Sequence, residues 1–347
     1  MLKAKKIFNK GRALWPGMAT VAMISAAASF ISLNLGGPVM LYALLLGLVF
    51  HFVMQETRAA AGVNFAARIV LRIGVALLGV RLTLTDIASL GVPVTVLVIS
   101  AVGVSILVGS WIGQASGMER SFSYLSAGAV SICGASAALA IASVLPKTPE
   151  QEKQTGLTVV AVTCLSTVAM ILYPVLLEML NADHYTAGIF IGATIHDVAQ
   201  VIGAGYIISE ETGDVSAIVK LMRVICLMPL VLLISIGVGR RASMENTDAV
   251  NEKDAVDEKY ERPPLVPGFI LAFLGLVVLT SIGVIPETVQ GAVSDVSRWC
   301  LIAAVAALGV KTSLGELVRI GPMPVLVMVL QTIFLALFIA AGLLLIG

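Results

Sequence analysis

Long apolar segments separated by short polar turns dominate the pattern of hydrophobic positions in this chain. Uncharged stretches run from 13 to 50, 87 to 118, 121 to 146, 154 to 177 and 263 to 286. A helix needs only about 20 apolar residues to cross a bilayer. The pattern therefore predicts an all-α integral membrane protein that crosses the membrane many times.

Glycine, proline and short polar turns divide these segments into about eleven predicted transmembrane helices. They lie near 14–33, 37–54, 64–84, 92–114, 122–145, 155–179, 186–208, 214–239, 265–284, 293–312 and 322–346.

Composition agrees with this class. Hydrophobic residues make up 58% of the 347 residues and charged residues 12%, against about a quarter charged in soluble domains. A net charge of +1 argues against a nucleic-acid partner. The four cysteines lie in apolar segments without a CxxC spacing or a histidine at ligand spacing, so neither a metal nor a cofactor is expected.

Basic residues indicate the orientation of the chain. Arg58, Arg120, the Arg240–Arg241 pair and Arg319 fall in loops of one side if the N-terminus is cytoplasmic. Lys147 and Lys153 disagree with that assignment. The segment 240–263 is charged and lacks apolar periodicity, so it is predicted to be a cytoplasmic linker between transmembrane parts 1–239 and 264–347.

The two parts share sequence. A shift of 230 residues places LGVRLTLTDIASLG, residues 78–91, on LGVKTSLGELVRIG, residues 308–321. Glycines match in this alignment, and Arg81 falls on Lys311 and Arg68 on Arg298. Chance similarity between apolar segments does not explain matched glycines and charges.

The number of crossings between the copies makes the repeats inverted. The third predicted helix aligns with the tenth, so Arg81 and Lys311 should lie on opposite sides of the membrane. Inverted repeats are typical of secondary transporters, which bind substrate near the midplane and expose it to each side in turn.

A helix-capping pattern occurs in the middle of a predicted span. In TIHD, residues 194–197, the Thr194 hydroxyl and the Asp197 carboxylate are placed to cap a new helix. The pattern predicts an unwound break at 192–194 and a half-helix that starts at Ile195. A continuous helix, with its Thr hydroxyls bonded to the preceding turn, is the alternative.

A second break is predicted in SICGASAALA, residues 131–140. Gly134 would interrupt the helix and Ser136 would cap the next half. We expect the two breaks to face each other near the midplane, with both half-helix N-termini available to an anion.

Cations outnumber acids inside the predicted spans. Arg68 and Arg72 stand four apart and Lys220 and Arg223 three apart, so each pair shares a helix face. Charges at membrane depth are normally paired or functional. These four residues are therefore predicted to bind a small anion.

Asp197 and His196 are the candidates for proton coupling. A carboxylate facing a bound anion would repel it unless the carboxylate were protonated or paired. Protonation of Asp197 or His196 would then favour anion binding, and release of the proton would favour anion release.

The signature blocks SICGASA, FIGATIHDVAQVIGAG, VKLMRV and RIGVALLGVRLTL resemble those of the sulfate exporter family of bacterial inner-membrane proteins, also called the YeiH family. The resemblance implies a multi-pass inner-membrane transporter with inverted repeats and interrupted helices, similar to sodium/proton antiporter and bile-acid symporter folds. It also implies export of sulfate or a related sulfur anion. The residues that it marks are Ser131, Cys133, Gly134, Ser136, Thr194, His196, Asp197, Gln200, Lys220 and Arg223.

Three functions remain open on the sequence alone. The first is secondary transport of a small sulfur oxyanion or sulfonate, coupled to protons or to another ion such as sodium, by a monomer or a homodimer in the lipid bilayer. The second is cation/proton antiport through Asp197. The third, a membrane-embedded enzyme, is disfavoured because the halves are duplicated and no catalytic triad or phosphate-binding loop occurs; a channel is also possible.

Overall fold

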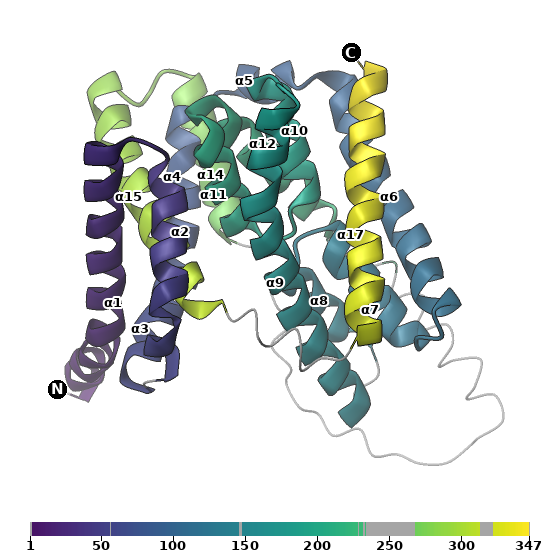
Figure 1. The fold of residues 1–347 in the computed structure, drawn as a ribbon. Coiled ribbons are helices and arrows are strands. Elements are labelled where there is room, and N and C mark those ends of the chain that lie inside the picture. Colours follow the sequence, from purple (N-terminus) through teal and green to yellow (C-terminus); the bar gives the residue numbers. More distant parts are fainter. Residues whose placement is uncertain are drawn as a thin grey trace.

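All regular elements in the described part of the chain are helices (Figure 1). The computed structural model describes residues 2–55, 57–145, 148–227, 229–231, 233, 268–312 and 322–346. The predicted linker at 240–263 lies outside these residues, as do Lys147, Arg240, Arg241 and Arg319.

The helices follow one another in this order: α1 (Leu2–Leu35), α2 (Val39–Val49), η1 (Phe50–Gln55), α3 (Thr57–Phe65), η2 (Ala66–Val70), α4 (Leu71–Leu78), η3 (Gly79–Arg81), α5 (Leu84–Ser89), α6 (Gly91–Ala115), α7 (Arg120–Ser131), α8 (Ala135–Ala142), α9 (Pro149–Met179), α10 (His184–Thr194), α11 (Val198–Ile208), α12 (Glu210–Ile225), α14 (Gly268–Ser281), α15 (Glu287–Lys311) and α17 (Pro322–Ile346).

Six helical stretches in the described residues are long and apolar enough to cross a bilayer, which agrees with a multi-pass membrane protein. They are Ala13–Leu35, Arg58–Arg81, Gly91–Ala115, Pro149–Met179, Glu287–Lys311 and Pro322–Ile346.

Two of the eleven predicted spans are wrong, because the chain reverses within each. Predicted span 122–145 is the hairpin α7–α8, in which a Cβ added to Gly128 would lie 2.2 Å from Ile141 Cδ1. The amide of Gln151 donates to the Ala142 carbonyl (3.1 Å), so α8 ends near the start of α9. Predicted span 186–208 is the hairpin α10–α11, whose first residue, His184, accepts a hydrogen bond from Thr212 at the start of α12.

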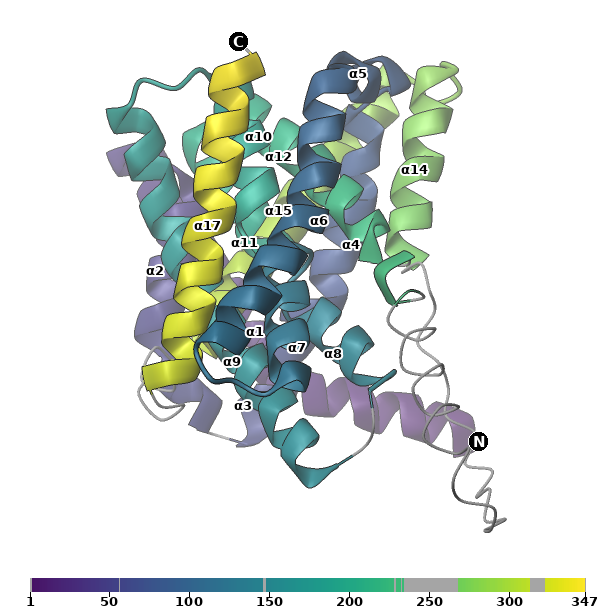
Figure 2. The same cartoon turned by 90° about the vertical axis from the view of Figure 1, so that its right-hand side faces the viewer.

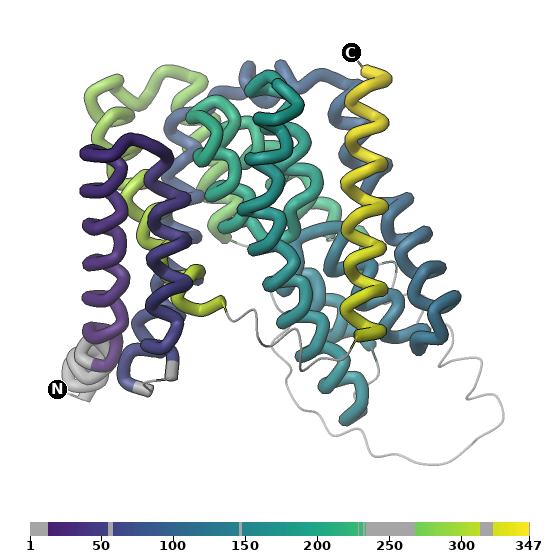
Figure 3. The backbone as a smooth tube through the Cα atoms, viewed as in Figure 1, coloured from purple at the N-terminus to yellow at the C-terminus, as the bar shows by residue number. Residues whose placement is uncertain are grey.

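The hairpins enter from opposite ends of the molecule and their tips meet inside it. Figure 3 shows α7–α8 rising from the end that holds the N-terminus and α10–α11 descending from the other end. This differs from the prediction that each segment is one membrane-spanning helix interrupted near the midplane. A turn at each tip reverses the chain, which a sequence pattern of glycine and short polar residues does not distinguish from a simple break.

The hairpins also resolve the disagreement over Lys153. Because α7–α8 returns to the end from which it started, the start of α9 lies on the same side as Arg120 (Figure 3). Lys153 then lies on the basic side with Arg58 and Arg120, as the positive-inside rule requires.

The remaining helices form a group that we call the frame: α1 to α4, α14 and α15, at the left of Figure 1. The hairpin group consists of α7 to α12, with α6 and α17 packed side by side along it (Figure 2). Among the helices of the hairpin group, α11 has the most extensive contacts with the frame, where it packs against α2 and α15.

The repeated segments occupy equivalent places in the frame. The shift of 230 residues maps Thr57–Arg81 onto α15, and α2 onto α14. A Cβ added to Gly79 would lie 2.4 Å from the Phe273 carbonyl of α14, and one added to Gly309, its equivalent, 2.4 Å from the Leu44 carbonyl of α2. Each glycine therefore allows the same close helix approach in its own repeat.

Labelling of single cysteines distinguishes a hairpin from a continuous span. On a background without native cysteines, we expect Glu119→Cys and Thr148→Cys to react with an impermeant maleimide from the same side of the membrane. Asp183→Cys and Glu211→Cys should both react from the opposite side. Labelling of positions 119 and 148 from opposite sides would show that α7 and α8 cross the membrane as one span.

Candidate functional site

The two hairpin tips lie against each other, as expected for the two breaks. A Cβ added to Gly134 would lie 3.5 Å from the Cβ of His196. Gly134 has φ +64° and ψ −126°, a conformation that residues with a Cβ rarely adopt. Glycine is therefore required at the α7–α8 tip for the turn, whereas a Cβ there would make only an ordinary contact with the α10–α11 tip.

Two buried cations of α12 hold both tips. The Lys220 ammonium donates to the Ile132 carbonyl at 2.6 Å and to the Ile195 carbonyl at 2.8 Å. The Arg223 guanidinium donates to carbonyls at the ends of α7 and α10. Its acceptors are Val130 (3.2 Å), Ser131 (3.1 and 2.5 Å), Gly192 (3.3 Å) and Ile195 (3.3 Å).

These contacts explain why the cations are buried. The last carbonyls of a helix have no partner within it, and the helix dipole makes that end partly negative. Lys220 is 0% exposed and Arg223 1%, and both supply the positive charge that these two helix ends need. The N–H groups of Arg223 are all directed at carbonyls in this structure, and anion binding by Lys220 and Arg223 stays a prediction.

Asp197, not Thr194, caps the second half-helix. The Asp197 carboxylate accepts from the Ala199 N–H at 3.1 Å, and α11 starts at Val198. The Thr194 hydroxyl donates to the Phe190 carbonyl within α10 (2.6 Å). The break thus lies at 195–197 rather than 192–194, and Gly192 instead lets α10 pack closely on Ser216 of α12.

The other half-helix has no side-chain cap. Gly134 is the N-cap of α8, and the Ser136 side chain is exposed rather than folded back as predicted. Ser131, at the end of α7, is buried and its hydroxyl has no hydrogen-bond partner among the described residues. Cys133 is buried at the start of α8, where its thiol lies close to the Ala137 backbone N–H. The start of α8 therefore has no oxygen cap of the kind that Asp197 provides for α11.

Polar side chains from α9 and α11 continue the site beside Asp197. Ser166 accepts the Asp197 backbone N–H at 3.1 Å. The Gln200 amide donates to Thr167 Oγ1 at 2.8 Å, whereas its buried Oε1 has no partner in the described part. Ser166 and Thr167 were not predicted, since isolated hydroxyls in an apolar helix usually bond to their own backbone.

His196 ties the tips to a third element. Its Nδ1 lies 3.0 Å from the Val130 carbonyl and its Nε2 3.0 Å from the Thr332 hydroxyl of α17. Thr332 also bonds the Met328 carbonyl at 2.8 Å. Both ring nitrogens therefore have partners, and His196 is fully buried.

The predicted pair Arg68 and Arg72 is not joined to the tips. Both side chains are exposed, and Arg72 has no ion-pair partner among the residues described. Arg68 lies within electrostatic range of Lys311, at the end of α15, and Lys311 within range of Asp197. Lys311 thus links the frame to the site electrostatically. The repeat alignment pairs Lys311 with Arg81, but Lys311 is not among the predicted site residues.

Comparison with known proteins identifies the family. The family model described as conserved hypothetical protein 698 matches residues 10–328. A UPF0324 membrane protein of Chlorobaculum tepidum is 46% identical over 94% of this chain and 88% of its own length. The UPF0324 membrane protein TauZ of Paracoccus pantotrophus is 45% identical over 96% of both chains.

The chain belongs to the UPF0324 family of membrane proteins. A second TauZ, from Paracoccus denitrificans, is 42% identical over 96% of both chains. No solved structure is significantly similar to this chain.

The Arg223 contacts predict a specific loss of stability. Arg223→Lys keeps the charge but cannot reach all of the carbonyls, and each lost charged hydrogen bond is worth about 1.5–3 kcal/mol. We expect the melting temperature in detergent to fall by several degrees. Arg72→Lys, an exposed control on α4, should leave it unchanged; an equal melting temperature for both variants would show that Arg223 does not hold the tips.

Proposed function

We propose that this UPF0324 protein is a secondary transporter of a small anion, sulfate or a related sulfur oxyanion or sulfonate. The anion binds at the hairpin tips, and access alternates between the two sides of the membrane. Transport is coupled to protons or to another ion. The N-terminus lies in the cytoplasm of a bacterium, and the membrane is the inner membrane.

The charge balance at the tips supports an anionic substrate. Lys220 and Arg223 carry two positive charges, and each helix end contributes about half a charge. The C-terminal ends of α7 and α10 together contribute about one negative charge. The N-terminal ends of α8 and α11 together contribute about one positive charge, which the Asp197 carboxylate offsets. About one positive charge is left before Lys311 is counted. Since an uncompensated charge at membrane depth is costly, an anion completes the site.

The start of α8 supports a position for this anion. The first N–H groups of a helix have no partner within it and attract anions. The N-cap of α8, Gly134, makes no side-chain cap bond, and the buried Ser131 hydroxyl at the same tip has no partner among the described residues. Lys220 has a third N–H that is not used by the Ile132 and Ile195 carbonyls. These groups would surround a sulfur oxyanion from several directions.

The names of two relatives support a sulfur compound. The Paracoccus proteins are called TauZ, and we read the prefix as taurine, a sulfonate. A sulfonate and sulfate share the tetrahedral oxyanion that the start of α8 suits. A cation/proton antiporter is less consistent with the site, because Asp197 lies within electrostatic range of two cations, Lys220 and Lys311.

Asp197 is the proposed proton-coupling group, and its position predicts the effect of pH. Asp197→Asn keeps an N-cap oxygen but removes the charge that repels the anion. In proteoliposomes, we expect uptake of labelled sulfate or taurine by this variant to lose the pH dependence of the wild type. His196→Gln should alter the profile only if the imidazole carries the proton.

Asp183 provides a matched control, since it caps α10 at the far end of the same hairpin. Hydrogen bonds from the backbone and side chain of Thr186 lower the pKa of its carboxyl group, so it stays ionised at neutral and mildly acidic pH. Asp183→Asn should keep the wild-type profile. A wild-type profile in Asp197→Asn as well would mean that this carboxylate is only a helix cap.

A further inference from the structure

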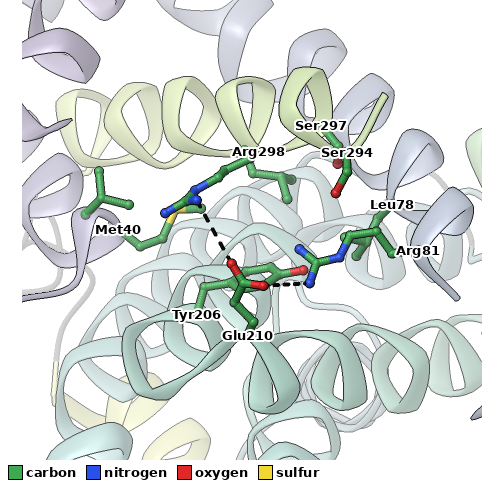
Figure 4. Close-up of a pocket in the computed structure, with 10 residues that line it drawn as sticks. Met40, Leu78, Arg81, Tyr206, Glu210, Ser294, Ser297 and Arg298 are labelled. Carbon is green, nitrogen blue, oxygen red and sulfur yellow. Dashed lines mark hydrogen bonds and ion pairs between the residues drawn. The ribbon is translucent and has the colours of Figure 1, made fainter. Parts of the chain in front are cut away.

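An ion-pair cluster joins the frame to the hairpin group at the end opposite the N-terminus. Arg81, at the end of η3, lies 2.9 Å from the Glu210 carboxylate and 3.3 Å from that of Asp214, both on α12. Arg298 of α15 approaches Glu210 at 4.0 Å. Figure 4 shows Glu210 between the two arginines. Tyr206 donates to Asp214, so this cluster ties α12 to the frame at that end of the boundary.

The repeat supplies the same cations at the other end. The shift of 230 residues maps Arg81 onto Lys311 and Arg68 onto Arg298. Lys311 and Arg68 lie within electrostatic range of each other, as Arg81 and Arg298 share Glu210. No ion pair is formed by Lys311 or Arg68 with any described residue. Asp197 is within electrostatic range of Lys311, but among the described residues this second pair of cations has no close ion pair like that of Glu210.

The hairpin group contains an equivalent acid. Each hairpin is followed by a helix with a hydroxyl N-cap and two acids in its first turn. Ser209 precedes Glu210 and Glu211 in α12, and Thr148 precedes Glu150 and Glu152 in α9. Glu210 directly follows its N-cap residue, Ser209, and Glu150 is the second residue after its own N-cap, Thr148. Glu150 is exposed, and α9 has at most marginal contact with the frame.

Packing of the hairpins shows the same asymmetry. α11 packs against α2 and α15 of the frame, whereas α8, its counterpart, has at most marginal contact with α4 or α14. Leu139 on α8 is 57% exposed. One hairpin is thus docked on the frame and the other is not, although the frame offers related surfaces to both.

We infer that Glu150 pairs with Lys311 and Arg68 in a second conformation, in which α8 docks on the frame and the Arg81–Glu210 pair is broken. The two ion-pair gates close opposite ends of the same boundary, so each conformation exposes the tips to one side. Loss of one set of pairs is offset by formation of the other, which keeps the two conformations close in free energy. This inference depends on the proposed transport function but not on the identity of the anion.

Cross-linking of cysteine pairs tests this gate. In membranes, on a background without native cysteines, Arg81→Cys with Glu210→Cys should cross-link through a short bifunctional maleimide, and Glu150→Cys with Lys311→Cys should cross-link in a separate fraction of molecules. Glu152→Cys with Lys311→Cys serves as the distance control and should react less. Absence of the 150–311 product, while the 81–210 product forms, would overturn the gate.

The fraction of molecules in each conformation should change when a charge of one gate is removed. Glu210→Gln removes one gate and should raise the 150–311 cross-linked fraction roughly twofold to fivefold, the range expected for a partly exposed ion pair. Arg72→Gln should not change it. An unchanged fraction in Glu210→Gln would contradict the exchange of gates. Because no substrate is added, a 150–311 product without sulfate or taurine uptake would refute the proposed substrate and leave the gate intact.

Discussion

The rest of this structure depends on the contact between two buried cations of α12 and the carbonyl ends of α7 and α10 at the two hairpin tips. Each hairpin tip leaves helix carbonyls without partners in a setting where water cannot satisfy them, and such groups cost several kcal/mol each. Lys220 and Arg223 satisfy carbonyls from both tips at once. The hairpins consequently form one unit with α12.

The same contact determines which groups remain for a ligand. Arg223 donates to carbonyls, and Asp197 accepts a hydrogen bond at the start of α11. The two ring nitrogens of His196 are hydrogen-bonded to Val130 and Thr332. What remains is the start of α8, one N–H of Lys220, and the Ser131 and Gln200 oxygens that have no partner in the described part of the chain. An anion at the start of α8 would be held mostly by backbone and by charge, which suits a tetrahedral oxyanion that must also be released.

Much of the site could be predicted from the sequence, because charge in an apolar chain is conspicuous. An interruption near each tip, the contact between the tips and the burial of Lys220 and Arg223 could be predicted from glycine, capping and charge patterns. The reversal of direction at each tip did not, since a short apolar helix gives the same pattern whether it continues or returns. The partners of the cations were missed because carbonyl acceptors carry no sequence signal.

The central claim is that an anion binds at the start of α8 between the hairpin tips. Alkylation of Ser136→Cys in the presence and absence of sulfate or taurine tests it most directly, with Leu139→Cys on the same helix as the control. The account predicts that the anion slows alkylation at position 136, and that chloride at the same ionic strength does not. Equal rates at position 136 with and without both anions, or equal protection at position 139, would contradict it.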